Sequence, residues 1–125
     1  MMRRVFKTRH FHRWMRKTDL SDAELCHAVA EMSQGLIDAD LGGGVVKKRI
    51  AMSGRGKSSG ARTLLATNRG SRWFFVFGFE KNERANIASD ELDVLQELAK
   101  DLLSRTIVQL DEAIVDGALL EICHD

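Results

Sequence analysis

Residues 45–84 read VVKKRIAMSGRGKSSGARTLLATNRGSRWFFVFGFEKNER, and this stretch decides the fold. Three apolar segments are separated here by two segments rich in Gly, Ser and Asn, a pattern typical of three β-strands joined by two turns. The stretch holds ten Lys or Arg against two acidic residues, gathered at the strand ends and turns. We therefore expect this positively charged sheet to bind a polyanionic partner.

The first two strands of this stretch carry basic side chains. In Val45–Met52 the alternation places Lys47 and Arg49 on one face, because successive side chains of a strand point to opposite faces. The second strand, Ala61–Asn68, ends in Asn-Arg-Gly, a hairpin signal because Asn and Gly accept the backbone angles of tight turns. The hairpin leads into Arg72.

The third strand is apolar throughout. Trp73–Phe79 has large apolar residues at both odd and even positions, which predicts a central strand covered on both faces. Most of these rings are therefore expected in the core. Only Phe77 or Phe79, near the basic end of the strand, is a candidate for stacking on a nucleobase.

A Gly-rich loop lies between the first two strands. Residues 51–58 satisfy a permissive phosphate-loop pattern, but a nucleotide loop must open a helix, and a strand-like segment follows instead. The same glycines suit a cationic hairpin loop that brings Arg55 and Lys57 close to a phosphate backbone, with Arg62 at the start of the next strand. A solvated charged turn explains the loop equally well from the residues alone.

Helical segments flank the stretch. On the N-terminal side we expect a strand over Arg3–Thr8, a short helix carrying Phe11, Trp14 and Met15, and a second helix that begins at Asp22. Ser21 and Glu24 form a capping box at its start, and Gly35 suits a left-handed cap at its end. The three glycines at 42–44 then allow a sharp turn into the sheet.

The C-terminal side repeats the helical pattern. Ser89 is predicted to cap a helix that runs to about Ser104, with a wide apolar face of leucines. A second helical stretch from about Val108 stops at Gly117, and a short closing strand or an apolar tail over Leu119–Cys123 follows. The fold is therefore predicted to be α+β: an antiparallel sheet, made of a three-strand meander plus an N-terminal strand, packed with N-terminal and C-terminal helices. We expect one domain, residues 1–125.

Composition bounds the class of protein. The chain has 125 residues, 44% of them hydrophobic and 30% charged, and neither an 18-residue apolar run nor the apolar middle of a signal peptide, so we expect a cytoplasmic protein and no membrane partner. The net charge is only +1, but it is segregated: residues 1–17 hold seven bases and no acids, and residues 85–125 hold ten acids and two bases. This segregation favours one positive face.

The Cys and His residues are not expected to bind a metal. Cys26 and Cys123 lie far apart and form no CxxC motif, which favours buried reduced thiols over a disulfide or a metal site. His10 and His12 lie in a basic segment that would repel a cation, so we interpret them as surface histidines.

Two segments resemble a known family. Residues 54–62, GRGKSSGAR, and residues 81–84, KNER, are similar to motifs of the RelE/ParE superfamily of toxins from toxin-antitoxin operons, particularly its RelE-like and HigB-like branch. The resemblance covers most of the chain. It implies a RelE-like α+β fold, a cognate antitoxin as partner, and entry into the ribosome to cut mRNA without a metal or cofactor, with the ribose 2′-hydroxyl as nucleophile.

The resemblance also implies a set of functional residues. The catalytic positions carried over are Arg62, Lys57, Lys81 and Arg84. The RNA-binding positions expected beside them are Lys47, Arg49, Arg55, Arg72 and Phe79. The chain contains no Tyr, which several RelE toxins use near the C-terminus, so the general base is left unassigned, with Lys81 or Lys57 as options. The alternatives are a non-catalytic inhibitor of DNA gyrase, as in ParE-like relatives, and an RNA-binding module unrelated to toxins.

Overall fold

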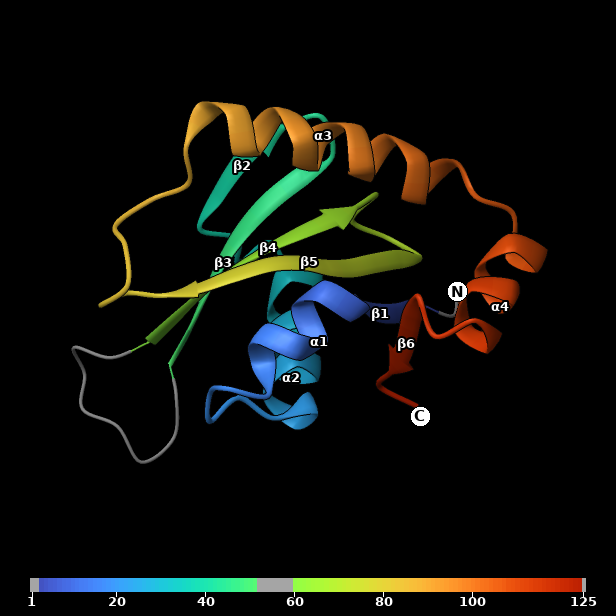
Figure 1. Ribbon diagram of the computed structural model, residues 1–125, viewed down its shortest axis with the longest axis horizontal. Helices are drawn as coiled ribbons and strands as arrows, with labels where there is room; N and C mark the ends of the chain where they lie inside the picture. The colour runs from blue at the N-terminus through green and yellow to red at the C-terminus, as the bar shows by residue number, and fades with distance from the viewer. Residues whose placement is uncertain (1–2, 52–59, 125) are drawn as a thin grey trace.

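The computed structural model describes residues 3–51 and 60–124, which form six strands and four helices (Figure 1). In chain order these are β1 Arg4–Thr8, α1 Arg9–Met15, α2 Asp22–Ser33, β2 Ala39–Gly42, β3 Val45–Ala51, β4 Gly60–Thr67, β5 Arg72–Glu80, α3 Ser89–Ser104, α4 Ile107–Val115 and β6 Leu119–Ile122. The segment expected to be a closing strand or a tail is strand β6. The sequence pattern did not predict β2, whose four residues include an Asp and a Gly, both rare in strands.

All six strands lie in one sheet, in the order β2-β3-β4-β5-β1-β6. Neighbouring strands are antiparallel except β1 and β5, which run parallel. The predicted α+β class is confirmed, and β3, β4 and β5 pair as consecutive antiparallel strands, but the sheet is mixed rather than purely antiparallel and extends beyond a strict three-strand meander. Parallel neighbours require a long crossover, which the segment from α1 to β4 supplies, and no local pattern within β1 encodes it.

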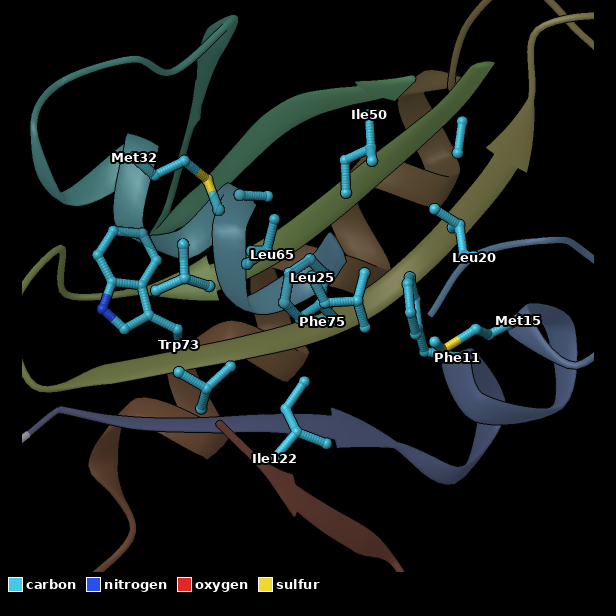
Figure 2. Close-up of a cluster of buried hydrophobic side chains, with 14 of the residues drawn as sticks. Phe11, Met15, Leu20, Leu25, Met32, Ile50, Leu65, Trp73, Phe75 and Ile122 are labelled. Carbon is cyan, nitrogen blue, oxygen red and sulfur yellow. The ribbon is translucent and has the colours of Figure 1, made fainter. Parts of the chain in front are cut away.

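Helices cover both faces of the sheet. In Figure 1, α3 lies along one face while α1 and α2 lie along the other. Phe11 of α1 and Trp73 and Phe75 of β5 are fully buried on the face that α1 and α2 cover (Figure 2). Phe6 and Phe74 are fully buried on the opposite face, in a cluster completed by α3 and α4. The prediction that β5 is a central strand covered on both sides is confirmed. Within the described residues, none of the helices is long and apolar enough to span a membrane.

One predicted helix start is confirmed and the other is wrong. At α2 the Ser21 hydroxyl accepts from the Glu24 N–H at 3.2 Å, while the Glu24 carboxylate accepts from the Ser21 N–H at 3.0 Å, which completes the capping box. At α3 the cap residue is Ala88, and Ser89 is already helical. Glu91 accepts from the Ala88 N–H at 2.9 Å, so this helix start is held by an acidic side chain rather than by a serine hydroxyl.

The hairpin between β4 and β5 forms, but with different backbone angles from those expected. Arg69, rather than Asn68 or Gly70, occupies the left-handed region with φ +62°. The Asn68 side-chain oxygen accepts from the N–H groups of Gly70 and Arg72, at 2.9 and 3.1 Å. The Asn side chain therefore holds the turn, while a neighbouring residue adopts the strained conformation.

The two cysteines form a disulfide, so the expectation of reduced thiols is wrong. Cys26 in α2 and Cys123, just after β6, have Cα atoms 5.5 Å apart although 97 positions separate them in sequence. Residues that are far apart in the sequence can lie close together in the fold, so their spacing in the sequence does not exclude a disulfide. Strand β6 pairs with β1, and α2 packs on the face that contains Val5 of β1, so the fold brings the two ends together.

Candidate functional site

Two cross-strand rows at one end of the sheet carry basic and aromatic side chains. The first row is Lys47, Leu64 and Phe77, and the second is Arg49, Arg62 and Phe79. Residues paired across strands, and residues two apart along a strand, share a face of the sheet. Because Leu64 is buried in the cluster beneath α3, both rows belong to the α3/α4 face. We call these two rows the basic end.

A β-bulge in β5 brings the aromatic residues into these rows. Trp73 and Phe75 face α1 and α2, so strict alternation would send Phe77 and Phe79 to that same face. The pairing of β4 with β5 skips Val76, which shifts the register by one residue. Beyond this point the odd-numbered residues of β5 face α3 instead. Bulges of this kind commonly redirect side chains beside functional sites.

The basic residues of the two rows differ in exposure. Arg62 and Lys47 are half-buried, whereas Arg49 is exposed. The Arg49 N–H donates to the Asp38 carboxylate at 2.7 Å, and Arg49 also borders a hollow beside α2. Arg49 therefore lies toward the margin of the sheet, while Arg62 is held on a central strand. A cation fixed on a strand loses less side-chain freedom on binding an anion than a cation on a mobile loop does.

Arg84 covers the aromatic residues of the basic end. Its guanidinium carbon lies 5.8 Å from the ring centre of Phe77 and 5.2 Å from that of Phe79. Its nitrogens also pair with the Glu91 carboxylate at the start of α3. The hydrogen bond to Glu91 raises the pKa of Arg84, and the same bond lowers the pKa of Glu91. Phe79 is only 2% exposed, so the structure does not support the predicted stacking of Phe79 on RNA.

Other predicted site residues separate into three groups. Lys81 is exposed, and its N–H donates to the Gly60 carbonyl at 3.0 Å, which places its backbone beside the start of β4 and near Arg62. Arg72 lies at the opposite end of β5 and donates to the carbonyl of Arg105, so the structure does not bring it together with the basic end. Arg55 and Lys57 fall outside the described residues.

An apolar groove of about 650 Å³ adjoins the basic end. It lies among α1, β5, α3 and β6. Its apolar walls are formed by Val76, Phe77, Leu95, Leu98, Leu102 and Leu119. Arg9, Arg13 and His10 of α1 also line it, and the His10 ring stacks on the Phe77 ring with centres 5.8 Å apart. No local sequence pattern indicates this contact, because His10 and Phe77 meet only once α1 has packed beside β5.

One comparison with known proteins identifies a family. A family model described as the RelE toxin of the RelE/RelB toxin-antitoxin system matches residues 3–122. The match includes every described helix and strand, and therefore both rows of the basic end and the groove beside them. No curated protein matches the chain.

Proposed function

The chain belongs to the RelE toxin family of toxin-antitoxin systems, and from this membership we propose that it is a ribosome-dependent endoribonuclease that cuts mRNA and stops translation. The observation that supports the proposal is the basic end of the sheet. Lys47 and Arg62 are held there on strands and share a face with the half-buried ring of Phe77. Phosphates and nucleobases are the two parts of RNA that such a surface can hold.

The proposed reaction uses the RNA 2′-hydroxyl as the nucleophile. Because this group is already attached to the substrate, the protein has to orient it in line with the scissile bond and stabilise the negative charge that develops on the phosphate. The 2′-oxygen forms a bond to phosphorus while the bond from phosphorus to the 5′-oxygen breaks. The products are a 2′,3′-cyclic phosphate and a 5′-hydroxyl.

Arg62 is the residue we assign to charge stabilisation. It is the central member of its row, and the planar guanidinium can donate two parallel hydrogen bonds to phosphate oxygens. Lys81, whose backbone adjoins the start of the same strand, is proposed to contact the same phosphate. Arg84 is proposed to keep the aromatic rings in place, because its guanidinium already pairs with Glu91. Lys57 keeps the catalytic role implied by the family motif.

Cleavage on programmed ribosomes tests the proposal. Purified protein is added to ribosomes stalled on a defined mRNA, and primer extension maps the 3′ ends, with ribosome-free mRNA as the control. We expect cuts only in the ribosome-bound message. Incorporation of labelled amino acids and of labelled thymidine is measured in parallel after induction in bacteria. If thymidine incorporation falls first and no mRNA is cut, the gyrase-inhibitor alternative replaces the proposal.

The family also implies an antitoxin, and we propose that it covers part of the basic end with acidic side chains. The charge of Lys47, Arg49 and Arg62 favours such a partner. Binding between oppositely charged surfaces weakens as salt screens them. Affinity of the purified pair, measured across a salt series, is therefore expected to fall, and binding that does not respond to salt would contradict this contact.

A further inference from the structure

Helix α1 takes the place beside β5 that a longer β1 would occupy. The pairing of β1 with β5 ends at Lys7 and Phe75, while β5 continues to Glu80. The chain turns into α1 at Arg9, and α1 packs against this unpaired part of β5. A Cβ atom on Gly78 would lie 2.4 Å from the Trp14 ring, so the helix can approach this closely only because residue 78 is a glycine.

Anchors at both sides of His10 fix the first turn of α1. The Thr8 hydroxyl caps the helix by accepting from the Phe11 N–H at 3.1 Å. The Arg9 guanidinium donates to the carbonyls of Gly117 and Asp116, at 3.0 and 3.1 Å. The imidazole of His10 lies on the Phe77 ring at an interplanar angle of 5°. The residue is nevertheless exposed, so its ring nitrogens can exchange protons with a bound molecule.

We propose that His10 is the general base that accepts the proton of the RNA 2′-hydroxyl, an inference that rests on the proposed ribonuclease function. Phe77 and Phe79 are two residues apart on the same face, a spacing of about 7 Å along a strand. Arg62 pairs with Phe79, and His10 stacks on Phe77. A phosphate held at Arg62 would therefore have its ribose near Phe77, on the side where His10 lies.

Among the described residues, the other titratable groups that line the groove are poor proton acceptors. Glu91 lines the same groove, but its hydrogen bond from Arg84 lowers its pKa, which weakens it as a base. Lys and Arg side chains are protonated at neutral pH and donate rather than accept, and the chain has no Tyr. An imidazole can both accept and release a proton in the course of a reaction, which is why histidine is the side chain most often used as a general base.

In the proposed step, His10 takes up the proton that the 2′-hydroxyl loses and later releases it. The proton of the 2′-hydroxyl moves to an imidazole nitrogen as the 2′-oxygen bonds to phosphorus, and the leaving 5′-oxygen takes a proton from water. The imidazolium then returns its proton to the solvent. The charged groups that line the groove around His10 are Arg9 and Arg13 of α1, Glu91 of α3 and Arg105 just after α3, with Arg84 paired to Glu91.

The test compares His10→Gln and His10→Phe with the wild-type protein and with His27→Gln. The His10→Phe variant keeps an aromatic ring on Phe77 but has no nitrogen to accept a proton. His27 is exposed on α2, on the other side of the sheet, which makes it the matched control. Single-turnover cleavage on programmed ribosomes is measured from pH 5 to 9, together with binding to the same ribosomes and circular dichroism.

We expect both His10 variants to cleave about 10²- to 10⁴-fold more slowly than wild type while binding stays within about threefold. The fall in wild-type rate at acidic pH should disappear in both variants, and added imidazole should restore part of the activity of a His10→Ala variant. A folded His10→Phe variant that retains the wild-type rate and its acidic fall would overturn the assignment. Absence of cleavage by the wild-type protein would instead reject the proposed function itself.

Discussion

The two faces of the sheet are covered to different extents. On the α1/α2 face, Trp73 and Phe75 are fully buried, and a disulfide joins α2 to the segment after β6. On the α3/α4 face, helical cover leaves Lys47 and Arg62 only half-buried at one end, and an apolar groove lies beside them. Both faces therefore hold a buried cluster, and the α3/α4 face in addition presents half-buried basic side chains beside a groove.

The bulge at Val76 makes this difference possible. Without it, Phe77 and Phe79 would join Trp73 and Phe75 on the α1/α2 face, and Arg62 would have no aromatic neighbour in its row. A shift of one residue in one strand thus redistributes aromatic side chains between the two faces. Substitutions on each face can test whether the α1/α2 face mainly determines stability and the α3/α4 face mainly determines activity.

The largest expected effect is on stability, from a substitution in the α1/α2 face. Phe75→Ala should lower the free energy of unfolding by about 3–5 kcal/mol, because it leaves a cavity in a fully buried cluster. Val94→Ala is the control, since Val94 lines the groove and is 68% exposed; it should change stability by less than about 0.5 kcal/mol. Urea unfolding of both variants measures how much free energy of unfolding each one loses. Equal losses in Phe75→Ala and Val94→Ala would contradict the prediction.

The next effect is on activity, from a substitution at the basic end. Arg62→Ala should slow mRNA cleavage by about 100- to 1,000-fold, because it removes a preorganised donor to the charged phosphate. The half-buried Arg62 leaves little cavity, so the unfolding transition should barely move. Arg16→Ala, an exposed cation at the end of α1, is the matched control. Wild-type cleavage by a folded Arg62→Ala variant would remove Arg62 from the site.

A third effect concerns the disulfide. Replacing both Cys26 and Cys123 with Ser should lower the free energy of unfolding by about 2–4 kcal/mol, because the bond restrains a long loop of the unfolded chain. The cleavage rate should be unchanged, since neither cysteine lines the groove. Thermal melting compares the stability of the oxidised wild-type protein with that of the double variant. A loss of cleavage in a folded double variant would show that the two faces are coupled.

The smallest effect is a dependence of stability on pH. The hydrogen bond from Arg4 lowers the pKa of Glu121, so the folded state favours the carboxylate. This contribution is present above the ordinary glutamate pKa, about 4.3, and is lost as the pH falls through the lower pKa of the folded state. Glu121→Gln should therefore cost about 1 kcal/mol at pH 7 and flatten the decline in stability toward pH 3. Urea titrations at several pH values measure how the free energy of unfolding depends on pH. If this dependence is the same in Glu121→Gln as in the wild-type protein, the Arg4–Glu121 pair is not its source.

Local features could be predicted from the sequence, and contacts between distant segments could not. The capping box of Ser21 and Glu24, the glycine turn at 42–44 and the central strand β5 each depend on neighbouring residues or on a single period. The parallel pairing of β1 and the disulfide depend on segments far apart in the chain, and the bulge depends on how β5 pairs with its neighbour β4. The contact of His10 with Phe77 belongs to the second kind.

The place of β1 between β5 and β6 sets the order in which the sheet can be completed. β1 is synthesised first, yet its two neighbours in the sheet, β5 and β6, are synthesised much later. Contacts between such distant segments form slowly, because a long loop must close before they contribute. Until Leu119–Ile122 has emerged, Val5 and Phe6 lack part of their cover. This toxin therefore completes its sheet only after most of its chain has been synthesised.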